Sequence, residues 1–238
     1  MKKAAIVTGA SGLVGMQLLH QLFSSKDYQY IVALSRRELA LKHSKLVQVV
    51  TDFKELPQIN LPEKLREKNM GGDLNSLITG LETSSLELHG YCALGTTLKQ
   101  AGSKEKFREI DHDYVIDFAS WCKKLGTKKF LYVSALGADK DSKFFYNRVK
   151  GEIEADLKNI SFDYLGIFRP SVLSGNRRES RLGEEIGRVV MNAVAFLGLF
   201  RKYKPIEGVK VAKCMVHHAN ADNAEKFEIL FSKDMQQF

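Results

Sequence analysis

The first predicted strand and turn of the chain read Ala4-Ala5-Ile6-Val7-Thr8-Gly9-Ala10-Ser11-Gly12-Leu13-Val14-Gly15. An apolar, β-prone run here ends in three glycines, and residues 16–22 follow with the apolar periodicity of a helix. A strand, a glycine turn and a helix in this order present free backbone N–H groups and a helix dipole to a phosphate. We expect Gly9 to form the tight turn, Gly12 to admit a pyrophosphate and Gly15 to let the helix pack closely on the sheet. A tight turn without a ligand is the alternative, but its place at the first strand–helix junction favours dinucleotide binding.

The bulk composition is that of an ordinary soluble globular protein. The 238 residues are 44% hydrophobic and 27% charged, with a formal net charge of +8. That charge invites a nucleic-acid interpretation, but the basic residues occur as scattered pairs and no nucleic-acid-binding signature accompanies them. The sequence therefore predicts no nucleic-acid partner, and a mildly basic surface with one site for an anionic ligand.

Cysteines and apolar runs indicate a cytoplasmic protein. Cys92, Cys122 and Cys214 are odd in number and widely spaced, which predicts buried thiols in a reducing compartment. The apolar run before Gly9 is too short for a secretory signal. Residues 189–200 are apolar but fall short of the ~20 residues that a bilayer span needs. We expect no transmembrane segment. The 189–200 run is instead interpreted as a helix buried against the substrate lobe or a subunit interface, as in a homodimer, and less favourably as a membrane-surface helix.

Strand-like and helix-like segments alternate through the first 170 residues. Strands are predicted over the ranges 30–35, 46–51, 90–94, 129–134 and 163–169, in addition to the one before Gly9, and helices over 74–81, 107–125 and 144–157; residues 61–72 are interpreted as a loop or short surface helix. This alternation predicts an α/β fold with a Rossmann-like, doubly wound parallel sheet. We expect residues 1–170 to form the NAD(P)-binding domain. Residues 171–238 are expected to be a small substrate or interface region, packed on that domain as part of a single structural unit.

An arginine pair follows the second predicted strand. In NAD-preferring folds an acidic residue at this place binds the ribose 2′-hydroxyl, whereas Arg36 and Arg37 suit the 2′-phosphate of NADP. A solvated basic pair is the alternative, and Glu38 could still reach a ribose. Asp52, at the end of the third strand, is placed to contact the adenine, although with Phe53 it could equally be a turn acid beside a core aromatic residue. The sequence thus predicts a preference for NADP(H) over NAD(H).

A tyrosine and a lysine four residues apart form a second constellation. Tyr146 and Lys150 would share one face of a helix, where the ammonium is expected to lower the pKa of the phenol toward working pH. Tyr146 could then exchange a proton with a substrate oxygen, while Lys150 hydrogen-bonds the nicotinamide ribose. Ser134 ends the fifth strand, where its hydroxyl could polarise the same carbonyl. A Tyr-Lys pair alone is common on helix surfaces, but a dinucleotide fingerprint upstream favours catalysis.

Two further clusters have simpler interpretations. The acids flanking His112, Asp111 and Asp113, are placed at a helix start, where acids stabilise the N-terminal dipole. His217 and His218 are adjacent and lack a neighbouring carboxylate or cysteine at ligand spacing, so no metal site is predicted.

Together these features resemble the short-chain dehydrogenase/reductase superfamily, in its atypical branch, close to the group of Tat-interactive protein 2-like oxidoreductases. The resemblance covers nearly the whole chain, and its most specific elements are Leu94-Gly95-Thr96-Thr97 and Glu179-Ser180-Arg181-Leu182-Gly183-Glu184. The chain departs from some relatives at Leu13-Val14, where they carry more polar residues, and it matches poorly after Gly187.

The resemblance implies roles for individual residues. The pyrophosphate would be wrapped by Ser11, Gly12, Leu13 and Val14, and the 2′-phosphate by Arg36 and Arg37. Leu94 and Gly95 would line the dinucleotide, and Leu173 and Arg181 would approach its nicotinamide half. Tyr146 would be the proton donor or acceptor, and Lys150 its partner on the ribose.

Three functions are compatible with these residues. The first is an NADP(H)-dependent oxidoreductase acting on a small carbonyl or alcohol. The second is an NADP(H)-binding regulator or sensor that acts through a protein partner without turnover; retention of both Tyr146 and Lys150 favours the enzyme. The third is a nucleotide-sugar epimerase or dehydratase, ranked last because the chain after Pro170 is short for enclosing a second nucleotide.

Overall fold

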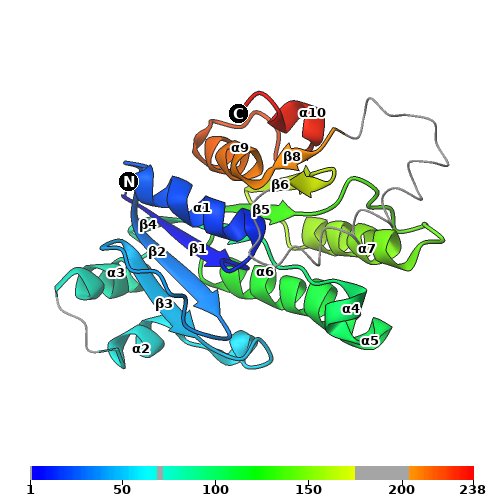
Figure 1. Cartoon of the computed structure of the whole chain (residues 1–238). Coiled ribbons are helices and arrows are strands. Elements are labelled where there is room, and N and C mark those ends of the chain that lie inside the picture. Colours follow the sequence, from blue (N-terminus) through cyan, green and yellow to red (C-terminus); the bar gives the residue numbers. More distant parts are fainter. Residues whose placement is uncertain (1, 69–71, 175–203) are drawn as a thin grey trace.

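Seven parallel strands form the central sheet of the protein (Figure 1). The structure is a computed structural model that describes residues 2–68, 72–174 and 204–238. The strands are β1 (Lys2–Thr8), β2 (Tyr28–Ser35), β3 (Leu46–Val50), β4 (Leu86–Cys92), β5 (Lys129–Val133), β6 (Tyr164–Arg169) and β9 (Phe227–Phe231). They lie in the order β3-β2-β1-β4-β5-β6-β9. The predicted doubly wound parallel sheet is therefore confirmed.

Helices cover both faces of this sheet. The longer helices are α1 (Leu13–Ser24), α3 (Gly72–Glu82), α6 (Tyr114–Lys124), α7 (Phe145–Asn159) and α9 (Gly208–Asn220); the short ones are α2 (Leu61–Arg66), α4 (Leu98–Ala101), α5 (Lys104–Arg108) and α10 (Ser232–Met235). A 3₁₀ turn, η1 (Leu56–Gln58), and a π-helical turn, η2 (Glu109–Asp113), complete the helical elements described. One apolar core lies between the sheet and α2, α3, α6 and α7, and a second lies between the sheet and α1, α9 and α10.

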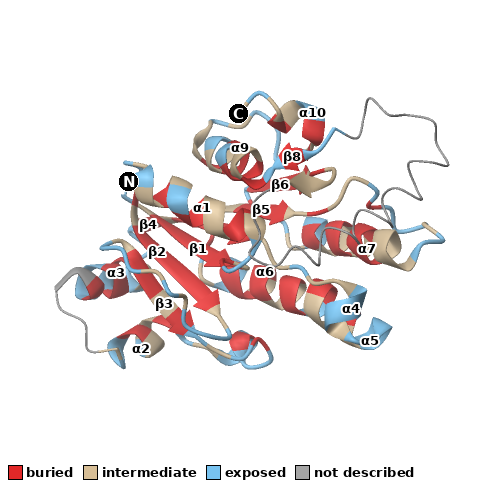
Figure 2. Cartoon of the chain, in the orientation of Figure 1, coloured by how far each residue is buried: buried red, intermediate tan, exposed pale blue. Residues whose placement is uncertain are grey.

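The central strands are almost continuously apolar in sequence because the sheet lies between two layers of helices. Residues 4–8 of β1 and 30–34 of β2 are buried, because each strand contributes alternate side chains to the two cores (Figure 2). Ala4 and Ile6 contribute to the first core, and Ala5 and Val7 to the second. All three cysteines are buried and free.

The strand order reverses direction at β1. Both β2 and β4 pair with β1, and the chain then continues outward in opposite directions from it. In open α/β sheets ligands bind at such a switch point, outside the carboxyl ends of the strands. The glycine turn at Gly9 follows β1 directly at this place.

The segment after Pro170 contains elements that the sequence pattern did not reveal. The seventh strand, β9, pairs in parallel with β6. Helix α9 of the same segment packs against α1 on one face of the sheet. Residues 204–238 therefore contribute a strand to the central sheet and side chains to its second core. Two short strands, β7 (Leu173–Ser174) and β8 (Ile206–Glu207), pair with each other in a small separate sheet. The apolar run 189–200 and Arg181 lie outside the described residues.

Within the described ranges, no helix is both long enough and apolar enough to cross a membrane.

Candidate functional site

The glycine turn between β1 and α1 has the geometry of an anion cradle. Gly9 has a φ of +75°, and a Cβ there would lie 2.3 Å from the backbone of Ala93 at the end of β4. A Cβ on Gly15 would lie 2.1 Å from the carbonyl oxygen of Gly9, so the helix can start this close to the strand only with glycine. The predicted turn and close-packing roles of these two glycines agree with this geometry.

The N-terminus of α1 is open to a ligand. Its N-cap residue is Gly12, which supplies no side-chain cap, and the first turn contains no acidic residue. Ser11 and Gly12 are exposed and Leu13 is half-buried, whereas Val14 is buried and packs in the second core. Uncapped N–H groups and the positive end of the helix dipole therefore lie at the switch point of the sheet, which suits a pyrophosphate.

The arginine pair follows β2 at the same edge of the sheet. Arg36 and Arg37 are exposed, and neither forms an ion pair with any residue in the described part of the chain. Two guanidinium groups that lack an ion-pair partner in the described ranges suit a phosphate monoester.

The residues at the end of β3 form a local turn. Asp52 is exposed and accepts a hydrogen bond from the backbone N–H of Lys54 at 3.0 Å. Phe53 is buried and stacks on Tyr114, with 5.6 Å between ring centroids. This geometry matches the alternative interpretation, a turn acid beside a core aromatic residue. The exposed Asp52 carboxylate nevertheless lies at the carboxyl edge, and its contact to adenine stays a prediction.

Three more residues were predicted to contact the dinucleotide. Leu94 and Gly95 follow β4 beside the glycine turn, with Leu94 half-buried and Gly95 exposed. Leu173 lies in β7, partly buried against the second core. Their contacts to a dinucleotide stay predictions.

Tyr146 and Lys150 both lie in α7, whose first turn begins at the carboxyl edge of the sheet. Tyr146 is half-buried and packs against Phe107, with ring centroids 5.8 Å apart. Burial raises the pKa of Tyr146 above its ordinary value, and the nearby Lys150 ammonium, which lowers it, does not offset this. The expectation of a lowered pKa is therefore wrong in direction: Tyr146 is a phenol at neutral pH.

Lys150 is fully enclosed and directed at a carboxylate. Its Nζ lies 2.9 Å from Asp111 Oδ1 and donates a hydrogen bond to the hydroxyl of Tyr132 at 3.0 Å. Burial alone would lower the pKa of Lys150, but Asp111 and the two tyrosine hydroxyls raise it well above its ordinary value. Lys150 is therefore a stable ammonium beside Tyr146.

Asp111 is the site residue that the sequence interpretation missed. It was assigned to a helix start as a dipole-stabilising acid, but it lies in the π-helical turn η2, within a continuous helical run from α5 to α6, and is 0% exposed. Its Oδ2 accepts a hydrogen bond of 2.7 Å from the backbone N–H of Thr96. The helical periodicity of the region was a usable signal, since it places an acid facing the interior of the predicted helix 107–125.

Ser134 points toward a different group. Its hydroxyl donates to Glu154, a buried carboxylate on α7 that also accepts two hydrogen bonds from Arg169, at 2.9 and 2.5 Å. Glu154 lies eight residues beyond Tyr146, about 12 Å along the helix axis. No hydrogen bond joins Ser134 to Tyr146 among the described residues, so the structure brings together Tyr146, Lys150 and Asp111 but not Ser134. The role predicted for Ser134 stays a prediction.

Comparison with known proteins agrees with this geometry. Residues 5–144 match the NAD dependent epimerase/dehydratase family. The chain belongs to that family. Protein HTATIP2 of Rattus norvegicus is 31% identical over 234 residues, which is 97% of this chain and 87% of the relative. The mitochondrial protein FMP52 of Candida albicans is 31% identical over 98% of this chain and 96% of its own length.

Solved structures share the fold of this epimerase/dehydratase family member. MoeE5 in complex with UDP-glucose and NAD superposes with a TM-score of 0.66 at 13% identity, covering 96% of this chain and 75% of MoeE5. Human epimerase family protein SDR39U1 with NADPH gives a TM-score of 0.58 at 14% identity, covering 95% and 73%. Both likenesses support the Rossmann-like architecture. The residues of this chain fit an NAD(P) cofactor, because the uncapped α1 N-terminus, the glycine cradle and the unpaired arginines supply donors where a dinucleotide needs them.

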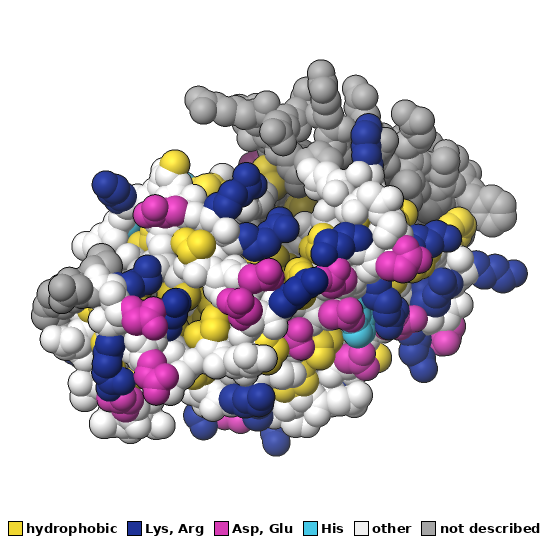
Figure 3. All heavy atoms as spheres, turned by 90° about the horizontal axis from the view of Figure 1, so that it is seen from below, with side chains coloured by type: hydrophobic (Ala, Val, Ile, Leu, Met, Phe, Trp, Pro, Cys, Tyr) yellow, Lys and Arg dark blue, Asp and Glu magenta, His cyan; other side chains and the backbone are white. Residues whose placement is uncertain are grey.

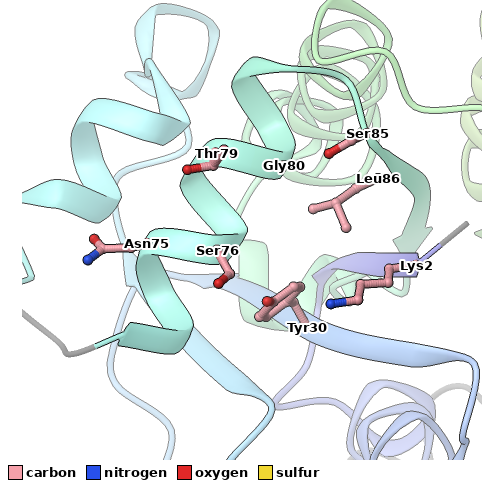
Figure 4. Close-up of a pocket in the computed structure, with 8 residues that line it drawn as sticks. All are labelled: Lys2, Tyr30, Asn75, Ser76, Thr79, Gly80, Ser85 and Leu86. Carbon is pink, nitrogen blue, oxygen red and sulfur yellow. The ribbon is translucent and has the colours of Figure 1, made fainter.

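A cavity lies at the amino ends of the strands, away from the glycine turn (Figure 4). It has a volume of about 350 Å³ and lies between α3 and the first residues of β1 and β4, with Lys2, Tyr30 and Ser85 among its lining residues. It lies at the amino end of β1, whose seven residues span about 20 Å before Gly9. None of the predicted site residues lines it.

On the face drawn in Figure 3, basic and acidic side chains alternate, without a continuous basic stripe. No group of three or more potential metal ligands occurs in the described ranges.

Proposed function

We propose that this family member is an NADP(H)-dependent oxidoreductase that reduces a small carbonyl compound. One observation carries the proposal: Tyr146 and the ammonium of Lys150 lie on α7 at the same edge of the sheet as the glycine cradle. When bound, a nicotinamide cofactor supplies the hydride for such a reduction. The uncapped turn of α1 and the Arg36–Arg37 pair would bind its phosphates.

The protonation states of the two side chains fit the reductive direction. Tyr146 carries its proton at neutral pH because burial raises its pKa. It can give that proton to the oxygen of a carbonyl group as the alcohol forms. The Lys150 ammonium then stabilises the phenolate that is left, because an opposite charge nearby favours the ionised form.

Two other functions remain as alternatives. A nucleotide-sugar epimerase or dehydratase is supported by the family and by MoeE5, which binds UDP-glucose. Against it, this chain covers only 75% of MoeE5, which has more chain with which to enclose a second nucleotide. A regulator that binds NADP(H) without turnover would not need the buried Lys150 ammonium beside Tyr146. A cytoplasmic location is part of the proposal, although the fungal relatives are named mitochondrial.

The experiment is a cofactor titration followed by turnover of a carbonyl panel. NADPH fluorescence should saturate with wild-type protein and with Tyr146→Phe at nearly the same affinity, since the hydroxyl is not a phosphate ligand. Turnover should fall by about 10²- to 10⁴-fold in Tyr146→Phe.

Each of the other outcomes would favour a different function. NADPH binding without turnover of any carbonyl would support the regulator, and conversion of a UDP-sugar would support the epimerase. Unchanged turnover in Tyr146→Phe would remove Tyr146 from the mechanism.

A further inference from the structure

The cavity between α3 and the first residues of β1, β2 and β4 contains an unpaired tyrosine hydroxyl. Tyr30 lines this cavity and is only 5% exposed, and its hydroxyl has no hydrogen-bond partner in the described part of the chain. The hydroxyl of a buried tyrosine usually has such a partner. Two residues earlier in β2, the Tyr28 hydroxyl contacts His89 Nδ1 at 2.6 Å and the Tyr91 hydroxyl at 2.5 Å. The Tyr30 hydroxyl is therefore available to a ligand in the cavity.

An irregularity in the strand pairing turns Tyr30 toward the cavity. Lys3 of β1 is paired with Tyr28 and the next residue, Ala4, with Tyr30, so β2 contains one extra residue at this point. Residues two apart in a regular strand share a face of the sheet, but Tyr28 packs in the second core and Tyr30 in the first. Bulges are frequent beside active sites, where they re-aim a side chain. Here the bulge places the Tyr30 side chain on the face of the sheet that α3 covers.

Lys2 gives the cavity a positive charge. Its side chain is exposed, lines the cavity and forms no ion pair with any residue that the structure describes. Figure 4 shows its ammonium directed toward Tyr30. No acidic residue of the described ranges lines the cavity, and Glu87 in the adjoining strand β4 pairs with His89 instead. The charge of Lys2 therefore suits an anionic ligand.

Small polar side chains form the rim of the cavity, and its floor is apolar. Ser76 and Thr79 of α3 and Ser85 ahead of β4 are exposed and line the cavity. Leu86 approaches the backbone of α3 at Gly80, where a Cβ would lie 2.6 Å from the leucine side chain. The volume of about 350 Å³ is at the lower end of the range for small-molecule sites. The cavity thus offers an ammonium and several hydroxyl groups beside an apolar floor.

We propose that this cavity is a second binding site, which takes a small organic anion, either a carboxylate or a phosphate monoester. The anionic oxygens would lie against the Lys2 ammonium and the Tyr30 hydroxyl, because charge-assisted hydrogen bonds are the strong ones. The organic part would lie over Leu86 and Gly80. The length of β1, about 20 Å, separates this site from the glycine turn, so its occupation requires neither cofactor binding nor turnover.

Backbone amide shifts in ¹⁵N-labelled protein can locate the anion. Phenyl phosphate and benzoate are the probes, and benzyl alcohol is their neutral analogue. We expect at least one anion to give saturable shifts at Ser76, Thr79 and Gly80 with a Kd of about 1 mM, and benzyl alcohol to bind at least about tenfold more weakly. The anion that binds more tightly assigns the ligand class.

Three results of this titration would overturn the proposal. Shifts confined to the Gly9–Gly15 turn would place the anion in the cofactor cradle instead. An absence of saturable shifts in α3 up to about 20 mM of either anion would mean that the cavity does not bind it. Equal affinity for benzyl alcohol would mean that the charge is not recognised.

Two adjacent lysines provide matched variants. Lys2→Met should weaken anion binding about tenfold, because it removes the ammonium from the cavity. Lys3→Met removes the same charge from the other face of the sheet, where Lys3 Nζ donates to Asn220 at 2.8 Å, and should leave the Kd within about twofold of wild type. Equal weakening in the two variants would make the attraction a general effect of net charge and would overturn the proposal.

Tyr30→Phe separates a role in binding from a role in the fold. Because the hydroxyl has no partner among the described residues, the urea midpoint should stay that of wild type, while the Kd for the anion should rise about fivefold. Tyr28→Phe breaks the contacts with His89 and Tyr91, so it should lower the urea midpoint and leave the Kd unchanged. An unchanged Kd in Tyr30→Phe would overturn the proposal, whatever its urea midpoint.

Discussion

The amino ends and the carboxyl ends of the parallel strands, called here the amino edge and the carboxyl edge of the sheet, hold their polar groups in different ways. At the amino edge a polar chain, buried except at Glu87, is complete: Glu87 accepts from His89 at 2.7 Å, His89 accepts from Tyr28 at 2.6 Å, and Tyr28 accepts from Tyr91 at 2.5 Å. Because a carboxylate only accepts hydrogen bonds, this order assigns a neutral His89 with its proton on Nε2. Every link has its donor and its acceptor.

At the carboxyl edge, several polar groups lack a hydrogen-bond or ion-pair partner in the described part of the chain. Thr8 Oγ1 is buried with no hydrogen bond, Asp111 Oδ1 has only its charge contact with Lys150, and the Arg36 and Arg37 side chains have no ion-pair partner among the described residues. The amino edge has one such buried atom, Thr127 Oγ1, ahead of β5. Positive φ does not distinguish the two edges, because Gly9 shares it with Ser84, Gly126 and Ser161, which lie ahead of β4, β5 and β6. Polar groups without a protein partner are typical of ligand sites, whereas closed hydrogen-bond networks stabilise a fold. The contrast therefore supports the proposal that the carboxyl edge binds the cofactor, while the His89 network stabilises the fold.

The close-packed glycine turn at the carboxyl edge should be the most sensitive point. Gly9→Ala places a Cβ 2.3 Å from the backbone of Ala93 at a φ of +75°, so we expect it to lower the free energy of unfolding by about 4 kcal/mol and to abolish NADPH binding. Gly126→Ala is the control: its φ is +84°, but no atom lies within 4 Å of the added Cβ. It should cost about 1 kcal/mol, from the backbone conformation alone. Equal losses in urea unfolding would mean that close packing at Gly9 contributes nothing.

The hydrogen-bonded chain from Glu87 to Tyr91 at the amino edge should make the free energy of unfolding depend on pH, and it should not affect cofactor binding. Burial lowers the pKa of His89 to about 4, against 6.5 for an ordinary histidine. Since the folded pKa is the lower one, the unfolded chain binds the proton first, and stability is lost as the pH falls from about 6.5 to 4. The loss of unfolding free energy from His89 should reach about 3 kcal/mol. Glu87 adds to this loss in the same direction: burial raises its pKa, but the hydrogen bond and charge of His89 outweigh burial and lower the pKa overall.

Urea unfolding across that pH range measures the effect. His89→Gln should flatten the slope, while His20→Gln, on the exposed face of α1, should leave it unchanged. A slope that persists in His89→Gln would assign the acid sensitivity to other groups and weaken the contrast between the two edges.

The sequence predicted most of the fold because local pattern and tertiary environment agree in the first 170 residues. Strand 129–134, helix 144–157 and the glycine turn differ from the structure by only a residue or two, since each combines an apolar pattern with a clear end signal. The start of β4 was missed because Glu87 and His89 break its apolar run; the burial of His89 depends on its hydrogen bond with Tyr28, which is distant in sequence. The five-residue strand β9 pairs with β6, and α9 packs on α1; both partners are distant in sequence, so no local pattern reveals them.

The candidate site could be predicted in part for the same reason. Tyr146 and Lys150 were found because their spacing of four residues is local. Asp111 was misinterpreted because its partner Lys150 is 39 positions away, and a π turn has no strong sequence signature. The direction of the pKa of Tyr146 was wrong for a related reason: the pattern shows the nearby ammonium but not the burial that outweighs it.

The smallest expected effect tests whether the unpaired arginines belong to the ligand-serving edge. Replacing both, in Arg36→Ala/Arg37→Ala, should weaken NADPH binding about tenfold, or 1.4 kcal/mol, and leave NADH binding almost unchanged, because only NADPH carries the 2′-phosphate. Lys26→Ala/Lys42→Ala, which removes two exposed lysines ahead of β2 and β3, is a control for loss of net charge. Equal weakening of NADPH and NADH would make the arginines a general electrostatic attraction. No change for either cofactor would make them a solvated surface pair, and the ligand-serving part of the carboxyl edge would then be limited to the glycine turn and the region around Asp111 and Lys150.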